Sequence, residues 1–273
     1  MLHAETTLPQ AGHSAGESRR KVLARVDGLP ITLADEAETV RAVMRDARAG
    51  VPFALHTLNL DHLAKCRRDA RFREAYLKAR HITADGWPVV WLARRQGAEI
   101  ERTTGADLLL PLMEMAAVMD MPVAFIGSTP DVLRRAHEEM LRRMPGLRVV
   151  LRLAPSHQFT PDGAEATAIL RQIGESGARL CVLALGAPKQ ELFAARAVEQ
   201  GVPCGFLCFG AALDFIAGAQ RRAPRWMQRT GTEWLWRVMT NPGRLAARYA
   251  EDARLFARLA WRELTGHHGA ARR

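Results

Sequence analysis

Between residues 51 and 218 the chain alternates short apolar runs with longer amphipathic stretches, and this alternation restricts the fold more than any other feature. Apolar runs of this length, bounded by turn residues, are typical of strands buried between two layers of helices. The pattern therefore predicts an α/β fold with a Rossmann-like, mainly parallel sheet covered by helices. The expected strands are residues 53–58, 81–84, 122–126, 147–153, 180–185 and 203–209. Before them, Asp27-Gly28 predicts a hairpin over residues 22–31, and a helix is expected over residues 32–48.

Length and composition fit a globular chain. It has 273 residues, of which 48% are apolar and 25% charged, so it can bury a substantial core. No stretch approaches the roughly 18 apolar residues of a transmembrane helix, and the polar start lacks the apolar segment of a secretory signal. The scattered cysteines Cys66, Cys181, Cys204 and Cys208 predict reduced buried thiols in a cytoplasmic protein. They lack further ligands at recognisable spacing, so neither a metal nor another cofactor is expected.

Positive charge is concentrated at the C-terminal end. The net charge is +10, and beyond Gly218 twelve arginines face four acidic residues, which accounts for eight of those charges. On a helix over residues 242–265, five arginines would lie within an arc of about 120° beside an arc of four apolar residues. These residues are Arg244, Arg248, Arg254, Arg258 and Arg262, and Leu245, Tyr249, Phe256 and Leu259. Four of the six tryptophans also lie beyond Gly218.

Arginine beside interfacial tryptophan suits an anionic membrane surface, where each cation contributes on the order of 1 kcal/mol. We therefore interpret this region as a membrane-docking appendage. Three alternatives stay open: a phosphate-bearing ligand, a helix packed on the core with a solvated arginine face, and a basic arm that binds nucleic acid. The nucleic-acid alternative is the weakest, because the region has no recognisable nucleic-acid-binding motif.

Polar side chains follow two expected strands, at the edge where open parallel sheets bind ligands. Thr57 and Asn59 come at the end of strand 53–58 and suit contacts to substrate hydroxyls, although Asn59 is equally an ordinary helix cap. Asp85 follows strand 81–84 and precedes Gly86, which is a good position for a general base and also for an ordinary N-cap.

Three further loops predict contacts to an anion or a sugar. Arg102 precedes a helix expected near Leu108, and Gly127 follows strand 122–126; for both, a structural turn or cap is an equal explanation. The third loop follows strand 180–185 and brings Lys189 into a helix start, where the helix dipole disfavours a cation. A locally disfavoured residue is more often present for a ligand. The candidate binding residues of this loop are Gly186, Lys189, Gln190 and Glu191.

Several catalytic signatures are missing from the sequence. It contains no GxGxxG after a strand, no GxxxxGK[ST], no GxSxG and no HExxH. Nicotinamide oxidoreductases, P-loop NTPases, α/β-hydrolases and common zinc peptidases therefore lack their signatures here. No Asp-x-Asp occurs either, so charge on a diphosphate would be neutralised by arginine rather than by a divalent ion.

Five segments resemble, in order and spacing, the WecG/TagA/CpsF glycosyltransferases. They are HTLNLDH at 56–62, TADG at 83–86, RTTGAD at 102–107, LGAPKQE at 185–191 and RAPRWMQ at 222–228. Each is weak alone, but five in the same order form a specific signal. The resemblance implies a metal-independent bacterial enzyme that transfers a sugar, with inversion, from a UDP-sugar to a polyprenyl-diphosphate-linked sugar in cell-envelope polysaccharide or exopolysaccharide synthesis. The donors it suggests are UDP-N-acetylmannosamine, the uronic acid of that sugar nucleotide, and UDP-glucose.

The resemblance also implies roles for single residues. Asp85 would be the general base, while Thr57, Asn59, Arg102 and Gln190 would position donor and acceptor. Arg237, Arg244 and Arg248 would stabilise the departing UDP. Relatives commonly carry an arginine where this chain has Ala247, and Arg248 is its neighbour.

The expected organisation follows from these roles. Residues 1–20 would be a disordered tail, residues 21–218 the catalytic core, and residues 219–273 the Arg/Trp-rich membrane-docking appendage. The expected partners are the UDP-sugar, the lipid-linked acceptor and the membrane surface, with no nucleic acid, and a homo-oligomer is left open. The expected location is cytoplasmic, peripheral on the inner face of the cell membrane. A nucleotide-sugar enzyme without a lipid substrate remains a third alternative.

Overall fold

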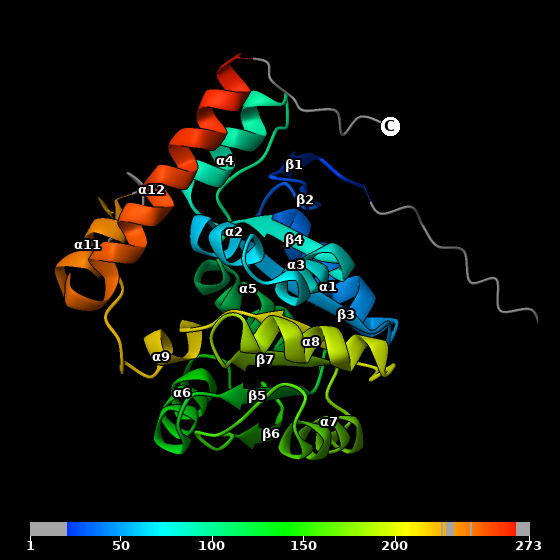
Figure 1. Cartoon of the computed structure of the whole chain (residues 1–273). Helices are drawn as coiled ribbons and strands as arrows, with labels where there is room; N and C mark the ends of the chain where they lie inside the picture. Colours follow the sequence, from blue (N-terminus) through cyan, green and yellow to red (C-terminus); the bar gives the residue numbers. More distant parts are fainter. Residues whose placement is uncertain (1–20, 225, 228–231, 241, 266–273) are drawn as a thin grey trace, which may run out of the picture.

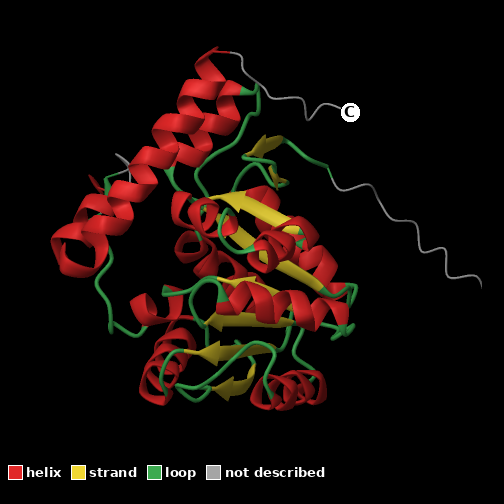
Figure 2. Ribbon diagram, viewed as in Figure 1, coloured by secondary structure: helices red, strands yellow, loops and turns green. Residues whose placement is uncertain are grey.

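A six-stranded parallel sheet forms the centre of the molecule, with strand order β4-β3-β8-β7-β5-β6. The structure is a computed structural model that describes residues 21–224, 226–227, 232–240 and 242–265. Figure 2 shows the strands as a layer between helices. The strands are β3 (Phe53–Leu58), β4 (His81–Ala84), β5 (Val123–Gly127), β6 (Val149–Leu153), β7 (Leu180–Ala184) and β8 (Gly205–Cys208). The antiparallel hairpin pairs β1 (Ala24–Val26) with β2 (Leu29–Ile31).

The predicted parallel sheet and its hairpin are confirmed, and each expected strand contains or overlaps one observed strand. The strands could be predicted from the sequence because the central strands are buried on both faces, and such strands consist of continuous apolar runs. In β7, for example, Leu180 and Val182 belong to one hydrophobic cluster and Cys181 and Leu183 to the other. The four cysteines are free and buried, as predicted.

Helices cover both faces of the sheet (Figure 1), because crossovers that leave a parallel sheet in opposite directions are right-handed and end on opposite faces. One layer contains α2 (Leu60–Cys66), α3 (Ala70–Lys78), α4 (Trp87–Arg95), α7 (Ala164–Ser176), α8 (Lys189–Glu199) and α12 (Pro242–Thr265). The other contains α1 (Glu36–Arg48), α5 (Gly105–Val118), α6 (Pro130–Arg143) and α9 (Ala212–Ile216). Helix α11 (Glu233–Thr240) contacts α12.

Two helices begin elsewhere than predicted. Helix α1 starts at Glu36 rather than at residue 32, because Thr32 is held against β4: its amide and that of Leu33 both donate to the Ile82 carbonyl. The Asp35 side chain then caps the helix by accepting from the Glu38 amide at 2.7 Å. Helix α5 starts at Gly105 rather than near Leu108, because Thr104 is its N-cap.

Helix α12 packs on the core through α2 and α4, as Figure 1 shows. Leu255 and Leu259 are buried in this interface, and Phe256 meets Trp91 edge-on with ring centroids 5.7 Å apart. Leu259 and Phe256 belong to the predicted apolar arc, but Leu255 lies within the predicted basic arc. Arg254, Arg258 and Arg262 remain exposed. The packed face is therefore rotated toward the arginines, and the exposed face keeps three of them.

The termini extend past what the structure describes. Residues 1–20, the expected disordered tail, lie outside the described residues. Among the described helices, none combines the length and apolar character that a bilayer crossing requires.

Candidate functional site

The carboxyl ends of β3 and β4 bring the predicted site residues together. The two strands pair in parallel with Thr57 opposite Thr83, so the residues that follow them emerge side by side. The Asp85 amide donates to the Leu58 carbonyl at 2.8 Å, which fixes the loop after β4 against the end of β3. Thr57, Asn59 and Asp85 therefore lie at one edge of the sheet, as the sequence predicted.

Asp85 is half-buried at this edge. The N-cap of α4 is the next residue, Gly86, so an ordinary capping role does not account for the carboxylate. Burial lowers the pKa of Arg222, but the carboxylates of Asp107, Glu233 and Asp85 outweigh burial and raise that pKa. Asp85 is thus within electrostatic reach of a guanidinium group from the RAPRWMQ segment.

Arg222 is the main functional candidate that single-residue reasoning missed. Its guanidinium lies 2.7 Å from the carboxylate of Asp107, which Arg102 also approaches at 3.4 Å. Burial raises the pKa of Asp107, but the hydrogen bond and charge of Arg222 outweigh it and lower that pKa. Two cations therefore share one carboxylate beside Asp85. The signal in the sequence was the RAPRWMQ segment as a whole, in which nothing local marks one residue above the others.

The structure gives Asn59 the capping role that the sequence left open. Its Oδ1 accepts from the His62 amide at 2.9 Å and begins α2. Thr57 is buried, and its carbonyl accepts from the Tyr76 hydroxyl at 3.2 Å, while His62 Nδ1 lies 2.5 Å from that hydroxyl. Tyr76 thus anchors the end of β3. Substrate contacts by Thr57 and Asn59 stay predictions.

Gln190 and Glu191 lie beneath the edge of the sheet, in the first turn of α8. Gln190 Nε2 donates to Glu191 Oε1 at 2.8 Å, and Gln190 Oε1 accepts from the Gly210 amide at 3.2 Å. Burial raises the pKa of Glu191 to about 7, with the hydrogen bond from Gln190 acting in the opposite direction. The pair links the loops after β7 and β8, and its predicted role in substrate binding stays a prediction.

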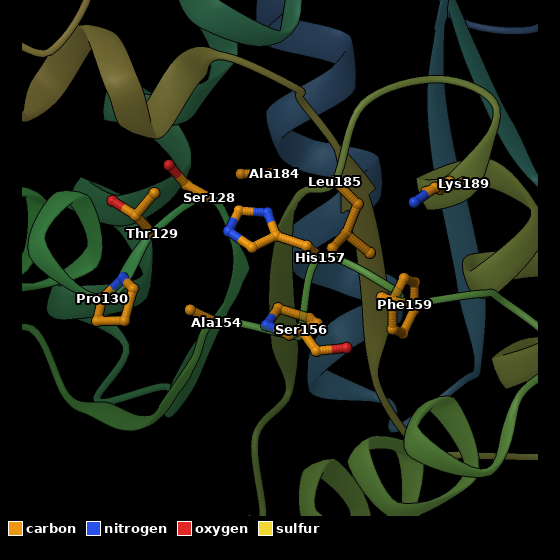
Figure 3. A pocket seen from close by; sticks show the side chains of 11 residues that line it. Ser128, Thr129, Pro130, Ala154, Ser156, His157, Phe159, Ala184, Leu185 and Lys189 are labelled. Atoms are coloured by element: carbon orange, nitrogen blue, oxygen red, sulfur yellow. The ribbon is translucent and has the colours of Figure 1, made fainter.

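Gly127, Gly186 and Lys189 belong to a second region of the edge, shown in Figure 3. A Cβ on Gly127 would collide with the Ala184 backbone, so glycine permits β5 and β7 to approach closely. Gly186 has a φ of +72° in the turn before α8. Lys189 is the first residue of α8, as predicted, and lines a cavity of about 380 Å³ with Ser128, Thr129 and His157. His157 was not identified from the sequence.

The three predicted appendage arginines are described unequally. Arg237 lies in α11 and Arg244 in α12, and the side chains of both lie outside the part of the chain that the structure describes. Arg248 is placed: its Nε is 3.8 Å from Asp61 Oδ1, and its guanidinium carbon lies 5.1 Å from the Tyr249 ring centroid. Asp61 is the second residue of α2, two residues after Asn59, so Arg248 connects the appendage to the helix start that follows β3.

Asp252 is a buried acid in the α12 interface. Asp252 is only 4% exposed, and its Oδ1 has no hydrogen-bond partner in the described structure. Burial raises the pKa of Asp252 to about 6, assisted by Asp61 and Glu251 and opposed by Arg248 and Lys65. At neutral pH this carboxylate is therefore ionised at a cost to folding.

We predict that Asp252→Asn stabilises the protein at neutral pH. The unfolded group loses its proton near pH 4 and the folded group near pH 6, so stability falls as pH rises through that window. The expected gain at pH 7.5 is about 1 to 2 kcal/mol, or a few degrees in melting temperature. The gain should disappear at pH 4, and the exposed control Asp162→Asn, which lies outside the α12 interface, should give no such gain at neutral pH. An equal effect at both pH values would contradict this assignment.

The described residues contain no candidate metal site. Among them, no three His, Cys, Asp or Glu side chains are grouped closely enough to hold a metal ion. A carboxylate at the end of one strand, arginines beside it and a basic helix packed above it form a site suited to displacing an anionic leaving group. The family model described as the WecG/TagA/CpsF glycosyl transferase family matches residues 24–269, so the chain belongs to that family and is a glycosyltransferase of cell-envelope polysaccharide synthesis.

Proposed function

We propose that this glycosyltransferase moves a sugar from a UDP-sugar to a polyprenyl-diphosphate-linked sugar at the inner face of the cell membrane. The observation that carries the proposal is the position of α12. It contacts α2 and α4, the two helices that begin directly after the loops of Asn59 and Asp85. A basic helix that meets a membrane would thereby hold the lipid-linked acceptor next to the carboxylate.

The proposed reaction is a single displacement at the anomeric carbon. The Asp85 carboxylate takes the proton of the acceptor hydroxyl, and the oxygen forms a bond to the anomeric carbon. The bond from that carbon to the UDP oxygen breaks, and both of its electrons leave with UDP. Attack from the face opposite the leaving group inverts the configuration. Thr57 and Asn59 lie at the same edge and would hold sugar hydroxyls.

Arginine is proposed to carry the role that a divalent ion has in other glycosyltransferases. Arg248 approaches the site from α12, and Arg237 and Arg244 are expected to join it. Arg102 and Arg222 add cations at the base of the site, partly neutralised by Asp107. Fixed guanidinium groups stabilise the charge that develops on the departing diphosphate and cost no reorganisation at that moment.

The exposed face of the appendage supports membrane docking. Trp261 is 69% exposed and Leu264 60% exposed near the C-terminal end of α12, and Arg254, Arg258 and Arg262 of the same helix are exposed as well. Trp226 and Met239 are also well exposed. Exposed large apolar side chains beside arginines suit the headgroup region of an anionic bilayer.

A donor and chelator assay tests the proposal. UDP-N-acetylmannosamine, its uronic acid and UDP-glucose are each offered with a synthetic prenyl-diphosphate glycan in anionic vesicles, with and without EDTA. We expect transfer from one donor, release of UDP, an inverted product by NMR, and a rate that EDTA changes less than twofold because cationic side chains supply the charge. Loss of transfer with EDTA, restored by Mg²⁺, would refute arginine catalysis. Transfer to a soluble sugar at the same rate would refute the lipid acceptor.

A further inference from the structure

Two acids and two cations meet where α12 contacts α2. Asp61 and Lys65 belong to α2, and Arg248 and Asp252 belong to α12. One carboxylate oxygen of Asp61 lies 2.7 Å from Lys65 Nζ, and the other lies 3.8 Å from Arg248 Nε. Asp61 is therefore the group through which the core meets this guanidinium of the appendage, close to the carboxyl edge of the sheet.

Asp61 is a fixed and ionised anchor. It lies in the first turn of α2, where the helix dipole favours an acid, and Lys65 follows it one turn later. Burial raises the pKa of Asp61, but the hydrogen bond and charge of Lys65, together with the charges of His62 and Arg248, outweigh burial and lower that pKa. Because Lys65 already neutralises Asp61, the carboxylate can hold a second cation without strongly repelling an anion beside it.

Arg248 faces Asp61 with only one edge of its guanidinium. Its Nε is buried and has no hydrogen-bond partner in the described structure, since 3.8 Å exceeds the roughly 2.7–3.2 Å of an N–H···O hydrogen bond. The contact with Asp61 is thus a charge attraction across a short gap. Among the described residues, none accepts a hydrogen bond from the two terminal nitrogens of Arg248. These nitrogens carry most of the N–H donors of the group, so most of its donor capacity is available to a ligand.

The ordinary reasons for an acid at position 61 do not account for its contact with Arg248. The helix dipole and the ion pair with Lys65 both favour an acid there, but neither requires a cation from α12. Asp252 lies one turn after Arg248 on the same helix and is the other possible anchor. It is buried in the α12 interface, however, and it forms no ion pair with Arg248 in the described part of the chain. The position of the guanidinium therefore depends on Asp61.

From these contacts we infer that Asp61 is a positioning residue, which holds the Arg248 guanidinium at the end of β3 so that its terminal nitrogens meet the diphosphate of the departing UDP. A guanidinium that is in place before the reaction costs no reorganisation when charge develops. In this role Asp61 acts through Arg248 and touches no substrate. The inference rests on the proposed function, because it assumes that Arg248 acts on UDP, and it adds the core residue on which that action depends.

Calorimetric titration of the intact protein with UDP, combined with single-turnover transfer rates, tests the inference. Arg248→Gln should weaken UDP binding about tenfold and slow transfer about a hundredfold. Asp61→Asn should weaken binding about fivefold and slow transfer about tenfold, because Arg248 is then no longer held in place. In the Arg248→Gln background, the same change at Asp61 should leave both values within about twofold, since no guanidinium remains to be positioned. A role confined to folding would instead lower both values by the same factor in the two backgrounds.

Two further variants control for folding and for helix packing. Asp61→Glu keeps the carboxylate and should return UDP affinity and rate toward the wild-type values, which a loss of fold would not allow. Glu251→Gln removes the acid of the exposed Arg68–Glu251 pair, which also joins α12 to the region after α2. It should change neither value by more than about twofold, because exposed ion pairs contribute little and Arg248 keeps its anchor.

The outcomes separate the inference from the function on which it rests. If Asp61→Asn matches the wild type in UDP binding and in rate while transfer continues, the positioning role is overturned and the proposed function stands. Equal losses in the two backgrounds, or a wild type that binds no UDP, also overturn the positioning role. If the binding pattern appears while the wild type transfers no sugar to any lipid-linked acceptor, the positioning role stands and the proposed function fails.

Discussion

Asp85→Asn is expected to reduce sugar transfer by about a thousandfold and to leave UDP affinity within twofold of the wild type. Asparagine has nearly the same shape as aspartate but cannot accept the proton of the acceptor hydroxyl. Asp85 is half-buried and follows β4 one residue before the cap of α4, so the substitution leaves the cap and the strand intact. The measurement is the rate of a single turnover, with the enzyme and the lipid-linked acceptor both in excess over the donor.

Two matched variants make this result interpretable. Asp162→Asn makes the same change in an exposed loop residue paired with Arg71, and should leave the rate unchanged. Asp107→Asn removes the other carboxylate near the site, the one shared by Arg222 and Arg102. It should weaken binding more than it slows the chemical step, since Asp107 orients cations and does not take the proton. Full activity of Asp85→Asn, or a larger loss of rate in Asp107→Asn, would show that the base is another group.

The sequence predicted the parts of the site that depend on local order. Strands buried on both faces have unbroken apolar runs, and the residue after such a run must emerge at the carboxyl edge. That logic is enough to place Thr57, Asn59 and Asp85 at one edge of the sheet. The same reasoning could not decide the role of Asn59, because an asparagine after a strand caps a helix as readily as it binds a substrate hydroxyl. In the structure, Asn59 caps α2.

The remaining parts depend on contacts between distant segments. Arg222 meets Asp107 across more than a hundred residues, and nothing local marks either residue for the other. His157 reaches the cavity from an irregular loop after the edge strand, which has no signature of its own. The rotation of α12 was unpredictable for a related reason. Leu255 interrupts the basic arc, and which arc packs depends on the surfaces of α2 and α4, which helical periodicity does not contain.

Replacing Arg254, Arg258 and Arg262 together with glutamine is expected to reduce binding to anionic vesicles about a hundredfold. Each arginine near anionic headgroups contributes about 1 kcal/mol, so three contribute about 3 kcal/mol. The three side chains are exposed, so the packed face of α12 with Leu255 and Leu259 stays intact. Deleting the whole appendage would be a poorer experiment, because it would uncover the apolar surface of α2 and α4 that α12 now covers.

Sedimentation with vesicles that contain phosphatidylglycerol measures this effect, and neutral phosphatidylcholine vesicles give the baseline. Glutamine at Arg142, Arg143 and Arg171, three exposed arginines of α6 and α7, makes the same change in net charge and should leave binding within twofold. A second variant, Trp261→Ser with Leu264→Ser, should weaken binding to both vesicle types, because apolar insertion does not depend on lipid charge. With a short-chain acceptor in solution, both α12 variants should keep their turnover. Loss of that turnover would mean that these residues serve the chemical step, whereas equal vesicle binding by the wild type and both variants would remove the appendage as the docking surface.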